Sequence, residues 1–191
     1  DANGQALLPA ITWQDTRCAP DAAALEAQVT TEQKVAWFGA PMPIDASHAL
    51  SRMAHVRRVA PEVYERTRHV LLPKDYCVMQ LTGAVGSDPV SAVGLVGSTG
   101  YVSELLELVP GSEELLPPLG KFHEVAGRVR DGLPCAGVPV VIIDSGLDSE
   151  AIVSFVATDN FLGGQLAADR MGELLGGEGS ILVLRYAEGS E

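Results

Sequence analysis

The sequence has few cysteines, and their arrangement excludes two classes of site. There are three, Cys18, Cys77 and Cys135. An odd number at such wide spacing argues against a disulfide framework and against a CxxC metal site. Cysteine use of this kind is typical of a protein in a reducing cytoplasm.

Positive charge is also scarce. Lys and Arg number 13 against 25 Asp and Glu, which gives a net charge of −12. A surface this acidic repels phosphate backbones and anionic lipids, so neither nucleic acid nor a membrane is expected as a partner. No apolar run approaches the roughly 18 residues of a membrane span. The first residues lack the basic-then-apolar pattern of a signal peptide, so a cytoplasmic location is expected.

The remaining composition is that of a globular protein. Hydrophobic residues make up 47% and charged residues 20% of the 191-residue chain, so a packed core is expected in one domain or two small ones. In the first part of the chain, apolar runs at 7–13 and 69–73 predict short strands. Start signals (Pro, Asp or Ser) and terminal glycines predict helices, one of them beginning near Ser87. The other predicted helices cover 20–29, 45–59, 62–68, 74–81 and 103–109.

The chain changes character at residue 137. The run Gly-Val-Pro-Val-Val-Ile-Ile-Asp at 137–144 predicts a buried strand of a parallel sheet. A second strand is predicted at 154–158, a helix at 161–175 and a third strand at 181–184. This order indicates an open, mostly parallel α/β sheet, in which ligands bind outside the carboxyl ends of the strands. Asp144, the first polar residue after the first strand, is therefore a candidate ligand group.

A polar turn follows the first apolar run. It reads Trp-Gln-Asp-Thr-Arg at 13–17. Asp15 and Arg17 are candidates for ligand binding, and the alternative is a surface ion pair on a solvated loop. His48 and His55 are seven residues apart, which does not fit the i, i+4 metal pair. The spacing of Gly94, Gly97 and Gly100 matches no phosphate-binding loop.

Four blocks together carry a family resemblance. They are Leu-Pro-Ala-Ile-Thr-Trp-Gln-Asp-Thr-Arg at 8–17, Leu-Leu-Pro-Lys-Asp-Tyr at 71–76, Leu-Thr-Gly at 81–83 with Ser87-Asp88, and Glu-Val-Ala-Gly-Arg-Val at 124–129. Their order and spacing resemble FGGY-family carbohydrate kinases, xylulokinases in particular. The resemblance implies a partial actin-like (ribonuclease H-like) domain of an enzyme that phosphorylates a sugar with ATP and Mg²⁺. It also implies that Trp13 contacts the sugar; the alternative is that Trp13 anchors the core.

The sequence departs from the family pattern in two respects. The resemblance leads us to expect a glycine-rich phosphate hairpin with a Gln-Met-His-Gly-type loop, and neither is found in the sequence. Where the family has a Gly-Gly-Gly-Asp-type turn that supplies the catalytic base, this chain reads Ile-Ile-Asp-Ser-Gly at 142–146. We therefore expect the kinase module, 1–136, to be inactive alone and to bind neither ATP nor Mg²⁺ by itself.

The residues from 137 to 191 resemble a different family. Val-Pro-Val-Val-Ile-Ile-Asp-Ser at 138–145, Ala-Thr-Asp-Asn at 157–160 and Gly-Gly-Gln-Leu-Ala-Ala-Asp at 163–169 are similar to ribose-type periplasmic sugar-binding proteins of ABC transporters. The resemblance implies that Asp144 hydrogen-bonds sugar hydroxyls; the alternative is a loop cap. It also implies a periplasmic location if a signal peptide lies upstream.

Together the two resemblances predict an α/β chain formed by fusion of two incomplete sugar-handling modules, 1–136 and 137–191. Three functions remain open. The chain is a carbohydrate kinase family member, a monosaccharide-binding module, or a fusion fragment without function. Unpaired sheet edges near the join are expected to allow self-association.

Overall fold

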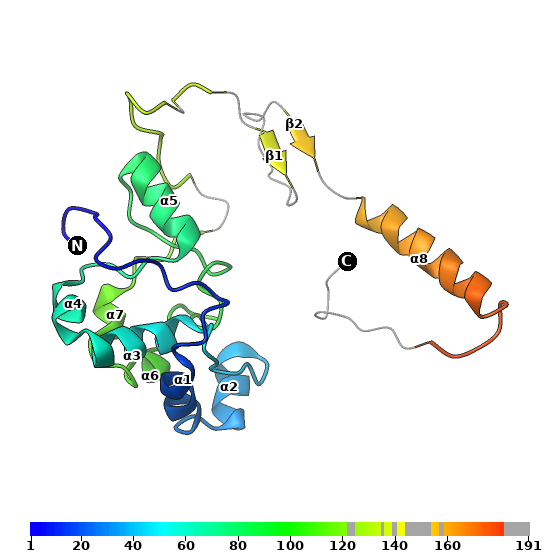
Figure 1. Ribbon diagram of the computed structural model, residues 1–191, viewed down its shortest axis with the longest axis horizontal. Coiled ribbons are helices and arrows are strands. Elements are labelled where there is room, and N and C mark those ends of the chain that lie inside the picture. Colours follow the sequence, from blue (N-terminus) through cyan, green and yellow to red (C-terminus); the bar gives the residue numbers. More distant parts are fainter. Residues whose placement is uncertain (122–124, 135, 139–140, 144–153, 157–158, 182–191) are drawn as a thin grey trace. The chain divides into compact units, whose positions relative to one another are not determined.

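The computed structural model describes residues 1–121, 125–134, 136–138, 141–143, 154–156 and 159–181. The chain divides into two compact units, Asp1–Ala136 and Gly137–Glu191 (Figure 1). This division concerns packing alone, and the separate origin of the two modules stays a prediction. In the described part of the chain, no helix has the length and apolar character needed to cross a membrane.

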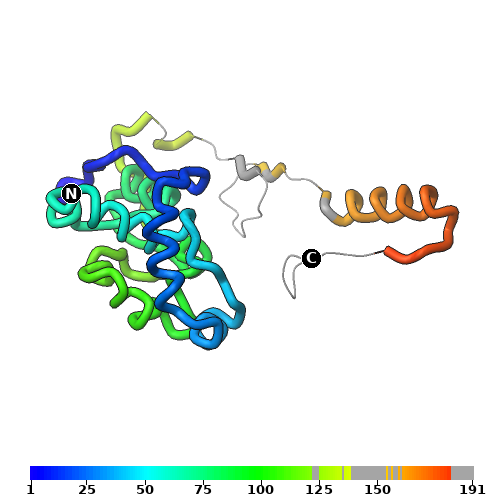
Figure 2. The backbone as a smooth tube through the Cα atoms, turned by 60° about the horizontal axis from the view of Figure 1, so that its bottom comes forward, coloured from blue at the N-terminus to red at the C-terminus, as the bar shows by residue number. Residues whose placement is uncertain are grey.

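Short helices form the first unit. Figure 2 shows how the backbone folds back on itself through them. They are α1 (Ala19–Glu26), α2 (Thr31–Phe38), α3 (Ala49–Val59), α4 (Pro61–Arg66), α5 (Pro73–Thr82), α6 (Ser103–Leu106) and α7 (Ser112–Leu115).

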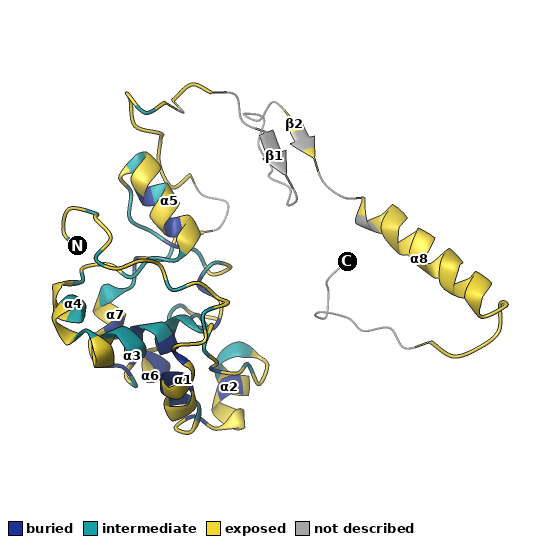
Figure 3. Cartoon of the chain, viewed as in Figure 1, coloured by how far each residue is buried: buried dark blue, intermediate teal, exposed yellow. Residues whose placement is uncertain are grey.

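The core of the first unit lies around α3. Leu50 and Met53 of this helix are buried, whereas Val56, three residues further along the same face, is only half-buried. Figure 3 shows the buried residues gathered where α1, α3 and α6 meet. The buried apolar cluster consists of Leu25, Val29, Ile44, Leu50, Met53, Leu95, Val102, Leu105, Leu106 and Val109.

The two strands predicted in this unit are wrong. Residues 7–13 and 69–73 form no strand, and the described residues of the unit contain only two isolated bridges, Ser87 with Leu119 and Val96 with Tyr101. A strand needs a neighbouring ladder along its length, and no described segment supplies one. The apolar residues at 7–11 instead line a cavity of about 580 Å³ together with residues of α3, α4 and α5. Of these residues, Leu7 and Ile11 are half-buried and the three between them are exposed.

The helix starts differ from the predictions at two places. The cap of α3 is His48, whose Nδ1 accepts a hydrogen bond from the Leu50 amide at 3.2 Å. Asp45, the predicted cap, instead bonds the amide and hydroxyl of Ser47 at 2.8 and 2.6 Å. The predicted helix after Ser87 is a series of turns, in which Asp88 accepts from the Val90 amide at 2.9 Å.

Helix α2 was not predicted, although the sequence holds its signal. Thr30 and Gln33 form a capping box, in which each side chain bonds the other residue's backbone amide. Gly39 ends the helix in the left-handed conformation, with φ of 74°.

The second unit contains two strands and a helix among its described residues. Strands β1 (Val141–Ile143) and β2 (Ser154–Val156) pair in parallel, as predicted. Helix α8 (Asn160–Leu174) is capped by Asp159, whose carboxylate accepts from the Leu162 amide at 2.8 Å. The strand predicted at 181–184 falls almost wholly outside the described residues. A parallel pair followed by a helix is common to many α/β folds, so it gives no support to a binding-protein origin.

Asp88 predicts an acid-dependent loss of stability. Partial burial opposes its ionisation, but the Lys74 ammonium at 2.5 Å and the Ser91 hydroxyl at 3.0 Å lower the pKa of Asp88 from its ordinary 3.8 to about 2. Because the folded pKa is the lower one, the stabilisation is present above pH ~4 and is lost as the pH falls towards 2. The shift corresponds to on the order of 2 kcal/mol.

We expect Asp88→Asn to flatten the decrease of the unfolding free energy between pH 4 and 2, measured by urea denaturation. Glu65→Gln is the control, because Glu65 is exposed and has no ion pair among the described residues. Equal slopes for Asp88→Asn and the unsubstituted chain would contradict the assignment.

Candidate functional site

Trp13 lies in a tight turn with its side chain in solvent. The residue is 73% exposed. The Asp15 amide donates to the Thr12 carbonyl at 3.1 Å, and the Ala19 amide donates to the Thr16 carbonyl at 3.0 Å. The backbone on both sides of the turn is therefore hydrogen-bonded, while the indole is available to a ligand. The alternative placement of Trp13 in the core is wrong.

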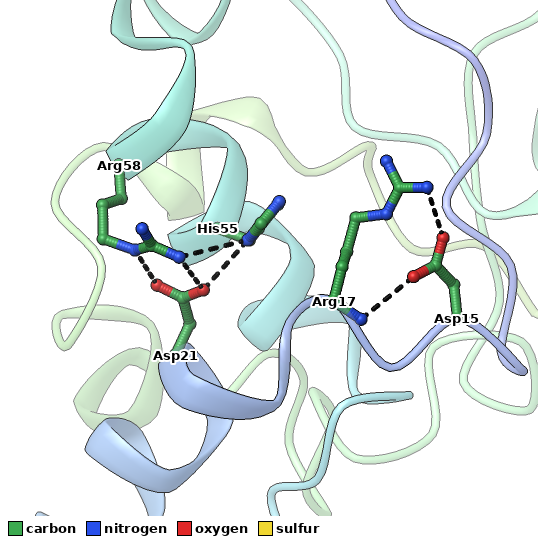
Figure 4. Close-up of polar contacts among 5 residues, drawn as sticks. All are labelled: Asp15, Arg17, Asp21, His55 and Arg58. Carbon is green, nitrogen blue, oxygen red and sulfur yellow. Dashed lines mark hydrogen bonds and ion pairs between the residues drawn. The ribbon is translucent and has the colours of Figure 1, made fainter.

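Asp15 and Arg17, the two other predicted residues of this turn, bind each other (Figure 4). One carboxylate oxygen of Asp15 accepts from the Arg17 amide at 3.0 Å, and the other lies 2.7 Å from the Arg17 guanidinium. The hydrogen bond from the guanidinium lowers the pKa of Asp15. This geometry is that of the surface ion pair considered as the alternative. Ligand binding by the two residues stays a prediction.

The turn leads directly into α1, and a buried carboxylate anchors this helix. Asp21, in the first turn of α1, receives two hydrogen bonds from Arg58 of α3, from Nε at 2.7 Å and from a terminal nitrogen at 2.9 Å. His55 Nδ1 lies 3.0 Å from the same carboxylate. Figure 4 shows both α3 side chains directed at Asp21. The hydrogen bonds from Arg58 lower the pKa of Asp21, against the opposing effect of burial.

The anchor was missed by the sequence reasoning. The spacing of three between His55 and Arg58 puts them on one face of their helix. The partner in α1 lies 34 and 37 residues away, and no local pattern identifies it.

The other predicted features lie elsewhere. Asp144 is outside the described residues. His48 contacts the Gly94 carbonyl through Nε2 at 2.9 Å, and burial lowers the pKa of its imidazole. Among the residues that the structure describes, no group of three or more His, Cys, Asp or Glu is placed to hold a metal ion.

The turn and its anchor combine an exposed aromatic face with hydrogen-bonding groups. The Trp13 indole offers a flat apolar surface. The Asp15 carboxylate and the Arg17 guanidinium, which is 60% exposed, are an acceptor and a donor close by in sequence. A ligand with both C–H faces and hydroxyl groups fits this combination.

Comparison with protein families places most of the chain in one family profile. The profile describes the N-terminal domain of the FGGY family of carbohydrate kinases, and it matches residues 1–162. The match covers the Trp13 turn, the α1–α3 anchor and both described strands.

Curated relatives and solved structures agree with the profile. The chain is 32% identical to a xylulose kinase from Escherichia coli over 74% of this chain and 30% of the relative, and 33% identical to one from Streptomyces coelicolor over 79% and 32%. It resembles the crystal structure of a xylulose kinase from Rhodospirillum rubrum with 26% identity and a TM-score of 0.61, covering 69% of this chain and 28% of that one. The chain thus spans about a third of the length of the curated relatives it matches.

The comparisons give no support to the second predicted module. The family match continues through residue 162, past the predicted join at Gly137 and through both described strands. The periplasmic-binding-protein resemblance and the periplasmic location therefore have no support from these relatives. The predicted second module begins with the β-branched run at 138–143, and a short run of this kind occurs in many parallel sheets.

Removing the Arg58 guanidinium is expected to destabilise the first unit. Arg58→Met keeps an apolar stem but leaves the Asp21 carboxylate, only 7% exposed, without its two strongest hydrogen bonds. The expected cost is about 1–3 kcal/mol in unfolding free energy, measured by urea denaturation at neutral pH.

Arg57→Met is the matched control, since Arg57 is exposed and makes no ion pair with another described residue. Equal stabilities of the two variants would show that Asp21 does not need Arg58.

Proposed function

The chain belongs to the FGGY family of carbohydrate kinases, and on this premise we propose that it supplies part of the sugar-binding side of an ATP-dependent sugar kinase. The named relatives are xylulose kinases, so D-xylulose is the proposed sugar. Phosphorylation of the sugar is proposed as the activity of the whole protein. The chain covers 30% and 32% of the two relatives compared above.

The exposure of Trp13 carries this proposal. A large aromatic side chain that is 73% exposed costs solvation free energy, yet it stands on a turn that is hydrogen-bonded at both ends. Single exposed apolar residues are common, but this one shares its turn with a carboxylate and a guanidinium, Asp15 and Arg17, that bind each other. Such an arrangement favours a role in recognition.

The proposed contacts follow from the chemistry of a polyol. The C–H face of the sugar would lie against the Trp13 indole. Asp15 would accept a hydrogen bond from a hydroxyl group, and Arg17 would donate one. Each of these residues has spare hydrogen-bonding capacity beyond their mutual contact, because a carboxylate accepts about four bonds and a guanidinium donates five.

ATP and Mg²⁺ enter the proposal through the family alone. In such kinases the metal neutralises charge on the transferred phosphoryl group. The described residues contain no cluster of three or more His, Cys, Asp or Glu suited to a metal. No step of phosphoryl transfer is therefore assigned to the residues of the Trp13 turn, whose proposed part is to bind and orient the sugar.

A tryptophan signal tests this proposal. The chain has two tryptophans, and Trp37 is half-buried with its ring 6.1 Å from that of Phe38. In Trp37→Phe, all tryptophan fluorescence comes from Trp13. Titration with D-xylulose is expected to change this emission saturably. No change at any concentration of D-xylulose would contradict sugar contact at Trp13.

Two further variants identify the binding group. Trp13→Phe, which reports from Trp37 alone, is expected to give no emission change. Trp13→Ala is expected to weaken binding roughly fivefold by calorimetry, for the loss of about 1 kcal/mol of aromatic contact. Binding that survives Trp13→Ala but disappears in Asp144→Ala would favour the binding-module alternative and contradict the proposal.

A further inference from the structure

Asp75 is a buried carboxylate whose oxygens are not hydrogen-bonded by the described residues. It lies in the first turn of α5 and is 1% exposed. Among the described residues, neither carboxylate oxygen is recorded with a hydrogen-bond partner. The Lys74 ammonium, itself half exposed, lies 2.7 Å from Oδ1 and pairs the charge of Asp75 from one side. A buried polar group in this state is costly, and native structures rarely leave one unsatisfied.

A small cavity adjoins this carboxylate. Its volume is about 10 Å³, and Asp75, Ser87 and Tyr101 are its polar lining residues. The Ser87 hydroxyl is also buried, and no described residue is recorded as its hydrogen-bond partner. The rest of the lining is apolar, with Leu95 and Ala92 among it. Two unsatisfied polar groups thus border one enclosed space.

The Tyr101 hydroxyl, the third polar group of the lining, already makes one hydrogen bond. The Tyr101 hydroxyl donates to the Pro117 carbonyl at 2.9 Å, which leaves its oxygen free to accept. Burial raises the pKa of Tyr101 to about 12, and the nearby negative charge of Asp75 adds to the effect. The carboxylate and the phenol are therefore close enough to interact electrostatically.

We propose that the cavity holds one water molecule bound by Asp75, Ser87 and Tyr101. About 10–15 Å³ is the space that one water needs, and buried waters make about three hydrogen bonds. The water would donate to an Asp75 oxygen and to the Tyr101 oxygen, and it would accept from the Ser87 hydroxyl. The Ser87 hydroxyl and one of the two Asp75 oxygens would then be hydrogen-bonded.

The site favours water over a metal ion. The Lys74 ammonium already balances Asp75 and would repel a second cation a few ångströms away. The four side-chain oxygens of the three polar lining residues are also fewer than the six to eight that hard cations such as Ca²⁺ take.

The bound water would fix α5 to the segment that follows it. Ser87 is held by backbone bonds, from its amide to the Pro118 carbonyl at 3.0 Å and from the Gly120 amide to its own carbonyl at 2.8 Å. A water between Ser87 and Asp75 would therefore join the start of α5 to Ser87 and, through the backbone bonds of Ser87, to the segment at 118–120.

A crystal structure of the chain, at a resolution that reveals ordered water, tests the proposal directly. The expected result is a single density peak within hydrogen-bond distance, about 2.6–3.2 Å, of Asp75 and Ser87. An empty cavity in crystals that show other ordered waters would overturn it. A peak at about 2.3–2.6 Å from several oxygens, which is cation geometry, would do so as well.

A pair of serine variants gives a second readout in solution. Ser87→Ala removes one of the water's partners and is expected to lower the melting temperature by about 2–4 °C. Ser51→Ala is the matched control, because the Ser51 hydroxyl is equally buried and unpaired but lines neither cavity described above. Its removal is expected to leave the melting temperature unchanged or higher, since it deletes an unsatisfied group. The same response from both variants would contradict the proposed water.

Discussion

The contact between Asp21 and Arg58 is the constraint on which the proposed sugar-binding turn depends. It joins α1 to α3 through a carboxylate that is 7% exposed, and α3 carries two buried residues of the apolar core, Leu50 and Met53. The Trp13 turn has little apolar packing of its own. The position of the turn is set by α1, which begins at Ala19, only a few residues later. Because the turn is already ordered before a ligand binds, binding loses less conformational entropy. This is the physical reason why an exposed aromatic residue here suits recognition.

Local signals predicted the helices well, because the groups that start and end a helix are neighbours in sequence. Pro73 and Gly83 delimit α5, and Asp159 caps α8, all close to the predicted places. The same logic would have found α2 through its capping box. The predicted cap of α3 was wrong. Asp45 and His48 both carry side chains that can cap a helix, but the Asp45 carboxylate is occupied by Ser47 and His48 is the cap.

Non-local partners could not be predicted from one sequence. An apolar run such as 7–11 does not identify the residues that it will contact. A strand was expected here, and the run instead lines a cavity. The pairing of Asp21 with Arg58, and the position of Asp75 beside Ser87 and Tyr101, depend on segments far apart in the chain. The candidate site shows the same limit. Its three residues in the turn were found from the sequence block, whereas the anchor behind them was not.

The family assignment extends what the geometry alone supports, and the second unit shows the risk of short motifs. Three short blocks between residues 138 and 169 suggested a second ancestry, yet the kinase profile continues through residue 162. The four blocks spread over the first 130 residues were a sounder basis, since each of them constrains a different part of the fold.

Amide hydrogen exchange in the free chain tests most directly whether the Trp13 turn is fixed by the helical core. The amides of Asp15, Arg17 and Ala19 each donate a hydrogen bond, as does the Ala22 amide inside α1. We expect the three turn amides to be protected to a degree comparable with Ala22. Exchange of the turn amides at the rate of an unstructured peptide, while Ala22 stays protected, would contradict a preformed turn and with it the proposed presentation of Trp13.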